Sequence, residues 1–108
     1  MIGATELALL ASGAIVVNVA RGALIDESAL VDALESGHVG GAALDVFQEE
    51  PLSPDSPFWA IPNVLVCSHS AGTSDHENER ITDIFCENLR RYLAGQPLRN
   101  VFDKDRMY

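Results

Sequence analysis

The sequence predicts one small α/β lobe built on an open parallel sheet. Three mostly apolar runs, at 14–19, 39–46 and 63–67, have the length of buried strands. The first is a nearly unbroken β-branched run, the second contains small residues where a helix could lie close, and the third is short. An amphipathic segment separates the first two runs. A strand, a helix and a strand within about thirty residues indicate a parallel βαβ unit with a right-handed crossover. The 108 residues are enough for one such lobe with a real core.

The segment between the first two strands carries the signals of a helix over residues 27–36. Asp26 precedes it, where its side chain can accept hydrogen bonds from the unpaired amides of the first turn. Leu30 and Leu34 share one face of this helix, so we expect that face to pack on the sheet. Gly37 follows as a left-handed stop.

Two further helices are predicted, one near each end of the sequence. Thr5 can cap a short helix that runs through Ala11, and Gly13 is placed to end it. The order Ser-Asp-His-Glu at 74–77 is typical of a capping box, and apolar residues then recur at three- and four-residue steps up to Gly95. We therefore expect a long amphipathic helix there, followed by a polar tail.

Composition and charge exclude several classes of function. The formal net charge of −9 argues against nucleic acid as a partner, because binding a phosphate backbone needs a clustered excess of Lys and Arg. No apolar run approaches the roughly 20 residues that cross a bilayer. Residues 7–11 are apolar but follow no basic residue, so we expect no secretory signal and a cytoplasmic protein.

The two cysteines have neither the spacing of a metal site nor the density of a disulfide framework. Cys67 ends a predicted strand, and Cys86 lies in the predicted long helix. Since free cysteine usually behaves as a small hydrophobic residue, we expect two reduced, buried thiols and no metal site.

Polar side chains follow the predicted strands, at the sheet edge where open α/β sheets bind their ligands. Arg21 comes just after the first strand, and Gly22 beside it lets a ligand approach the backbone. A guanidinium there can present parallel donors to a carboxylate, although an isolated loop arginine is usually a solvated surface charge. Asp45, at the end of the second strand, could bind a ligand or cap a turn.

His69 lies just past the third strand, where an isolated histidine is most often structural. Pro51 restricts Glu50 to an extended backbone and so fixes the direction of its side chain. If Glu50 reaches His69, its carboxylate would stabilise the imidazolium and orient the ring as a proton donor near neutral pH. His38 and His76 are expected to be surface residues, because neither lies at a strand end.

Three segments carry a pattern that can be compared with known families. They are Asn-Val-Ala-Arg-Gly at 18–22 with Asp26 after it, Gly-Ala-Ala-Leu-Asp-Val-Phe-Gln-Glu-Glu-Pro-Leu at 41–52, and Pro-Asn-Val at 62–64 with His-Ser-Ala-Gly at 69–72. In order and spacing they closely resemble the carboxyl-terminal part of the NAD-dependent D-isomer specific 2-hydroxyacid dehydrogenases, among them glyoxylate/hydroxypyruvate reductases and phosphoglycerate dehydrogenases. The match covers nearly the whole chain.

The resemblance implies a fold and an organisation. Residues 1–72 would be the carboxyl-terminal half of a dinucleotide-binding domain, the later portion of a Rossmann-like doubly wound parallel sheet with about three strands and flanking helices. Residues 73–108 would be a long carboxyl-terminal helix and tail that pack toward a substrate lobe. The sequence has no G-x-G-x-x-G turn to hold a pyrophosphate, and Cys67 and Ser68 stand before His69 where the family often has a proline.

The resemblance also implies roles for particular residues. Arg21 would hold the carboxylate and carbonyl of a small 2-keto or 2-hydroxy acid, His69 would be the acid/base, and Glu50 would hydrogen-bond His69. Hydride would pass between the substrate and NAD or NADP. Asp45 would contact the nicotinamide carboxamide, and the other cofactor contacts are expected at Val19, Ala20, Arg21, His69, Ala71 and Gly72.

Two functions remain open from the sequence. The first is a dehydrogenase fragment that is not competent alone, because half of the cofactor site and the substrate lobe of the family are not in these residues. The alternative is a non-catalytic remnant, an interaction or dimerisation module like the co-repressors of the same family, which keep similar motifs. An exposed edge of the first strand and the apolar face of helix 75–94 predict self-association in either case.

Overall fold

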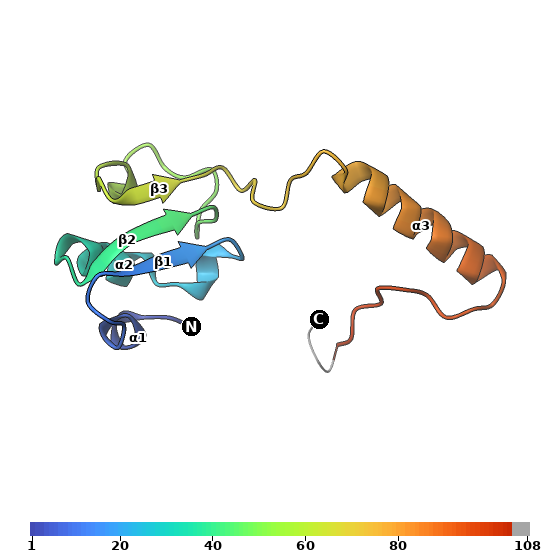
Figure 1. The fold of residues 1–108 in the computed structure, drawn as a ribbon, viewed down its shortest axis with the longest axis horizontal. Helices are drawn as coiled ribbons and strands as arrows, with labels where there is room; N and C mark the ends of the chain where they lie inside the picture. Colours follow the sequence, from blue (N-terminus) through green and yellow to red (C-terminus); the bar gives the residue numbers. More distant parts are fainter. Residues whose placement is uncertain (105–108) are drawn as a thin grey trace. The chain divides into compact units, whose positions relative to one another are not determined.

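The computed structural model describes residues 1–104 and divides into two compact units, Met1–Gly72 and Thr73–Tyr108 (Figure 1). The elements of the first unit are α1 (Ala4–Ala8), β1 (Ala14–Asn18), η1 (Gly22–Leu24), α2 (Glu27–Glu35), β2 (Val39–Leu44), η2 (Pro57–Trp59) and β3 (Val64–Val66). The second unit contains α3 (Glu77–Leu93).

The three strands form one parallel sheet in the order β1-β2-β3, which confirms the predicted fold class. Val17 pairs with Ala43, and Ala43 pairs with Leu65, so equivalent residues of the three strands share a register row. Because the strands are parallel, their carboxyl ends lie at one edge of the sheet (Figure 1). Each strand is shorter than its apolar run, since the last residues of each run enter the loops at that edge.

Helix α2 follows the predicted pattern. The Asp26 side chain accepts a hydrogen bond from the Ala29 amide at 3.1 Å and so caps the first turn. Leu30 and Leu34 are buried, and Gly37 after the helix has a φ of 76°, the left-handed conformation expected of a glycine stop.

The predicted caps of the other two helices are wrong. In α1 the N-cap is Gly3, whose amide donates to Glu6 Oε2 at 2.8 Å, and Thr5 lies inside the helix. In α3 the N-cap is His76, without a side-chain capping bond. A turn in which the Ser74 carbonyl accepts from the Glu77 amide at 3.0 Å precedes that helix and takes the place of the capping box.

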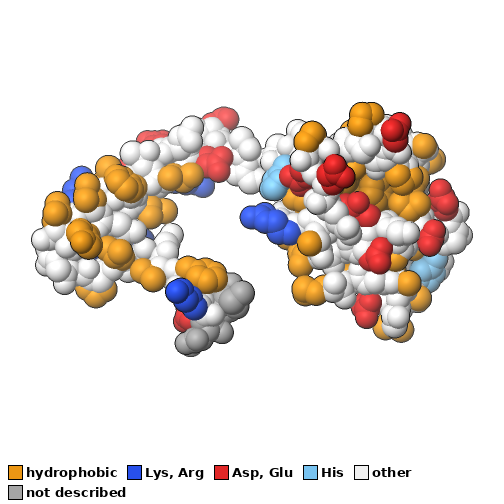
Figure 2. All heavy atoms as spheres, turned by 180° about the vertical axis from the view of Figure 1, so that it is seen from behind, with side chains coloured by type: hydrophobic (Ala, Val, Ile, Leu, Met, Phe, Trp, Pro, Cys, Tyr) orange, Lys and Arg blue, Asp and Glu red, His pale blue; other side chains and the backbone are white. Residues whose placement is uncertain are grey.

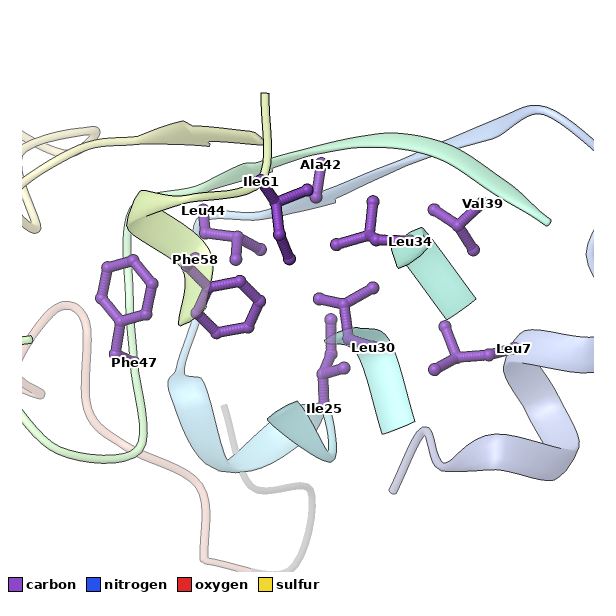
Figure 3. Packing of buried hydrophobic residues seen from close by; sticks show 10 residues of the cluster. All are labelled: Leu7, Ile25, Leu30, Leu34, Val39, Ala42, Leu44, Phe47, Phe58 and Ile61. Atoms are coloured by element: carbon purple, nitrogen blue, oxygen red, sulfur yellow. The ribbon is translucent and has the colours of Figure 1, made fainter. Parts of the chain in front are cut away.

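The hydrophobic core of the first unit lies between one face of the sheet and the segments α1, α2 and η2 (Figure 3). Leu7, Leu30 and Val39 are its largest fully buried side chains. Phe47, just past β2, packs its ring 6.0 Å from the ring of Phe58. This contact anchors the loop that follows β2 in the core, at the edge of the sheet where the candidate residues gather.

The opposite face of the sheet is apolar and exposed. Ile15, Val17 and Leu65 point away from the core and are 65%, 63% and 62% exposed. Helix α3 also exposes apolar side chains, Phe85 among them, and none of its residues is buried. In the part of the chain that the structure describes, no helix is long and apolar enough to span a membrane.

Candidate active site

The loop after β1 is held by Asn18, a buried polar residue that is 6% exposed. Its Nδ2 donates to the Arg21 carbonyl at 3.0 Å, and its Oδ1 accepts from the Ala20 amide at 3.2 Å. These two bonds fix the turn that carries Arg21. From the sequence no role was assigned to the Asn18 side chain, although a single polar residue within a β-branched run was a usable signal.

Arg21 is the only Lys or Arg among the first 72 residues, which contain nine Asp and Glu residues. Figure 2 shows acidic side chains distributed over the visible face of this unit. The Arg21 side chain is exposed, and its Nη1 donates to the Ala20 carbonyl at 2.6 Å. It forms no ion pair with any described carboxylate, so its remaining donors face solvent and can receive an anion.

Glu50 and His69 meet across the edge of the sheet. His69 Nδ1 lies 2.7 Å from Glu50 Oε2, and Glu50 Oε1 accepts from the Phe47 amide at 2.9 Å. The hydrogen bond from His69, the bond from the Phe47 amide and the nearby charge of Arg21 hold the pKa of Glu50 below its ordinary value.

The ionised carboxylate can only accept hydrogen bonds, so the His69 proton facing Glu50 lies on Nδ1. The His69 side chain is 48% exposed, and its Nε2 makes no hydrogen bond to another described residue. The ring is therefore oriented on one side and open to a ligand on the other.

Asp45, just after β2, lies beside the loop that carries His69. It is 4% exposed, and its Oδ1 and Oδ2 accept from the amides of Ser70 and Ala71 at 2.8 and 2.9 Å. The Ala71 and then the Ser70 amide lower the pKa of Asp45 from its ordinary value. The sequence left open whether Asp45 binds a ligand or caps a turn. In the structure its carboxylate caps backbone amides, but these amides belong to a loop 25 residues later in the chain and not to the turn after β2.

The loop that carries Glu50 is joined to the segment after Arg21. Gln48 donates from its amide to Glu27 Oε1 at 2.7 Å and from Nε2 to the Ile25 carbonyl at 3.1 Å. Gly22 is buried against the Phe47 backbone, where no side chain fits. These partners are more than twenty residues apart, so no local sequence signal could have identified them.

A cavity of about 290 Å³ opens beside Glu50 and His69. Its apolar wall comes from Phe47, Leu52, Trp59 and Cys67, among others. The expectation of two buried thiols is therefore wrong. Cys67 is exposed because it follows β3 and faces this cavity, and Cys86 is half-buried.

The other sequence-derived candidates divide into two groups. Val19, Ala20, Ala71 and Gly72 lie in exposed loops after β1 and β3, beside the residues described above. His76 is exposed at the start of α3, 3.4 Å from Glu79. His38 is half-buried rather than on the surface, and its Nε2 is buried without a partner among the described residues.

Comparison with known proteins finds one family over most of the chain. Residues 1–71 match the model of the D-isomer specific 2-hydroxyacid dehydrogenase NAD-binding domain. The chain is 40% identical to a glyoxylate reductase of Aeropyrum pernix over 97% of its length, and 38% identical to a D-3-phosphoglycerate dehydrogenase of Archaeoglobus fulgidus over 93%. It spans 31% of the first relative and 19% of the second.

Solved structures give the same result. A D-isomer specific 2-hydroxyacid dehydrogenase of Xanthobacter autotrophicus, in complex with NADPH and MES, matches 99% of this chain with a TM-score of 0.90 and 46% identity. A glyoxylate/hydroxypyruvate reductase of Sinorhizobium meliloti with NADP and sulfate matches 99% with a TM-score of 0.88 and 38% identity. The chain covers 43% and 35% of these two structures.

Proposed function

The chain belongs to the D-isomer specific 2-hydroxyacid dehydrogenases, as the sequence resemblance indicated, and we propose that it supplies the nicotinamide-binding and catalytic half of such an enzyme. The observation that carries this proposal is the 2.7 Å hydrogen bond between His69 and Glu50 at the sheet edge where the Arg21 loop also ends. The proposed reaction is hydride transfer between NAD(P)H and a small 2-keto acid, with the 2-hydroxy acid as product.

Arg21 is the proposed substrate anchor. A 2-keto acid presents a carboxylate next to a carbonyl, and a guanidinium binds that pair of oxygens with parallel donors. Arg21 is the single Lys or Arg residue in a unit with nine acidic residues, so an anionic substrate is attracted to this point and repelled by the carboxylates elsewhere. Gly22 and the Asn18 bonds hold the Arg21 backbone in place.

His69 is the proposed proton donor in the reducing direction. Glu50 holds its Nδ1 proton, so Nε2 is the atom that gives a proton to the substrate carbonyl oxygen and takes it back in the reverse direction. The Glu50 carboxylate holds the ring through Nδ1 and so leaves Nε2 oriented toward the substrate. A nicotinamide dinucleotide, when bound, supplies the hydride to the carbonyl carbon or accepts it in oxidation.

The residues at this edge of the sheet fit the nicotinamide end of such a cofactor. Val19 and Ala20 offer an exposed apolar surface to a flat ring, and Gly72 leaves open space beside the His69 loop. Each Asp45 oxygen accepts one amide proton and keeps a further lone pair for a carboxamide. Arg21, His69 and Ala71 complete the proposed contacts.

We further propose that residues 1–72 are the carboxyl-terminal half of the dinucleotide-binding domain and that residues 73–108 pack toward a substrate lobe. The chain spans about a third of its glyoxylate reductase relatives and has no G-x-G-x-x-G turn, so these 108 residues alone should not turn over substrate. Nothing in the described residues favours the alternative of a non-catalytic module.

Self-association is a related proposal. Among residues 1–104, β1 is an edge strand with no partner on its outer side, and the sheet face bearing Ile15, Val17 and Leu65 is exposed. We expect sedimentation velocity to show a species larger than a monomer as the concentration rises. A monomer at every concentration would contradict this proposal and leave the catalytic one intact.

The binding half of the proposal can be tested on the chain itself. Oxamate carries the carboxylate and carbonyl of a 2-keto acid, so its addition should shift the amide resonances of Arg21 and His69 in a saturable way. Arg21→Ala should weaken that binding by about 10- to 100-fold, the effect of losing charge-assisted hydrogen bonds. Arg80→Ala, in α3, is the control that should not change it. Equal binding by the parent and Arg21→Ala chains would contradict the proposal.

A further inference from the structure

We propose that Asp45 is a positioning residue for His69, which holds the backbone of the His69 loop in the conformation that aims the imidazole at Glu50. This inference rests on the proposed function, in which His69 is the proton donor. It gives Asp45 a task that is complete before any cofactor binds.

Asp45 holds the loop after His69 through two hydrogen bonds to its backbone. Its two carboxylate oxygens accept from the consecutive amides of Ser70 and Ala71, at 2.8 and 2.9 Å. Two successive amides converge on one anion only when the backbone curves into a concave nest. Hydrogen bonds to an ionised carboxylate are stronger than neutral ones, and Asp45 is shielded from water at 4% exposure.

His69, the residue just before this nest, has a φ of 55°. This left-handed region is sparsely populated by residues that carry a Cβ, and such a conformation persists only where the surroundings hold it. The direction of the Cα–Cβ bond depends on φ. If His69 relaxed to a negative φ, the ring would leave the direction in which Nδ1 lies 2.7 Å from Glu50 Oε2.

The loop is fixed on both sides of His69 by two consecutive residues of the β2 end. The Cys67 amide donates to the Leu44 carbonyl at 2.9 Å before the histidine, and Asp45 binds the two amides after it. The Asp45 amide in turn donates to the Asn18 carbonyl at 3.0 Å. Asp45, which holds the His69 loop, is therefore hydrogen-bonded to Asn18, which holds the Arg21 turn. The two loops that carry Arg21 and His69 are connected through this bond.

The inference predicts what a nearly isosteric change will do. In Asp45→Asn one oxygen still accepts an amide proton, but the new NH₂ group meets the other amide as donor against donor. We expect one of the two amides, Ser70 or Ala71, to exchange with solvent at least about tenfold faster. We also expect the Nδ1–H resonance of His69 to weaken or disappear. Asp55→Asn, which alters an exposed carboxylate outside the site, should change neither signal.

The experiment is nitrogen-15 NMR of the whole chain without cofactor or substrate, with circular dichroism to show that each variant folds. Unchanged amide exchange and an unchanged His69 Nδ1–H signal in a folded Asp45→Asn chain would overturn the inference. If that variant does not fold, the parent chain still decides the question. Its Ser70 and Ala71 amides must be protected and its His69 coupling constant must report a positive φ, and failure of either overturns the inference. Because no ligand is present, failure here is distinct from failure of the proposed function.

Discussion

Replacing Gly22 with alanine should separate the two loops that carry Arg21 and Glu50. A Cβ atom added at Gly22 would lie 2.0 Å from the carbonyl carbon of Phe47 and 2.4 Å from the Gln48 nitrogen. Carbon atoms pack at about 3.5 Å, so the two backbone segments would have to part by about 1.5 Å. Both neighbours are backbone atoms, which cannot turn away as a side chain would.

Two hydrogen bonds join the same two backbone segments, and their loss determines most of the expected decrease in stability. Gln48 donates to Glu27 Oε1 at 2.7 Å and to the Ile25 carbonyl at 3.1 Å. A separation of about 1.5 Å breaks both, at about 1 kcal/mol each. Strain in the buried backbone adds about 1 kcal/mol. The free energy of unfolding of Met1–Gly72 should fall by about 3 kcal/mol, which for a unit of this size lowers Tm by about 12 to 24 °C.

Thermal unfolding followed by circular dichroism measures this effect. The matched control is Gly72→Ala, because a Cβ at Gly72 would meet no atom within 4 Å, and its Tm should stay within about 2 °C of the parent. A Gly22→Ala chain that melts as close to the parent as this control would refute the reasoning, since the two loops could then part without cost.

Three further predictions concern the core, the response to pH and the thiols. Leu30→Ala should lower the free energy of unfolding, measured by urea titration, by about 3 kcal/mol, because Leu30 is 1% exposed. Leu9 is 81% exposed, so the control Leu9→Ala should change that free energy by less than about 0.5 kcal/mol. Since the folded pKa values of Glu50 and Asp45 lie below their ordinary 4.5 and 3.8, the stability they contribute is complete above about pH 4.5 and is lost as pH falls through the lowered values. The Tm of Glu50→Gln should therefore depend less on pH below 4.5, and an unaltered dependence would contradict this assignment. In the native chain Cys67 should react with a disulfide reagent faster than Cys86, and equal rates would show that the cavity wall is closed.

The fold could be predicted because its signals are local. A nearly unbroken β-branched run indicated β1, and short apolar runs after the helix stop and after the prolines indicated β2 and β3. The spacing of Asp26, Leu30, Leu34 and Gly37 indicated the intervening helix with its cap and stop. The contact between His69 and Glu50 could also be anticipated from the sequence. Parallel strands bring their carboxyl ends together, and Pro51 limits where Glu50 can point.

The support of the site could not be predicted, because its contacts join residues far apart in the sequence. Asp45 binds amides 25 and 26 residues later, and Glu27 binds the amide of Gln48. A backbone amide has no sequence signature, so nothing in the chain marks Ser70 or Gln48 as a partner. The cap of α1 is different, because Glu6 accepts from the Gly3 amide three residues earlier, and a glutamate at this distance from an N-cap is a local signal that was passed over in favour of Thr5.

The most direct test of the central claim is turnover by a chimera in which this chain replaces the matching third of the Aeropyrum pernix glyoxylate reductase. We expect NADH-dependent reduction of glyoxylate, a kcat lower by at least about 100-fold in His69→Ala, and no change in His76→Ala. An active chimera whose kcat is unchanged by His69→Ala would contradict the claim that this chain supplies the proton donor of the reaction.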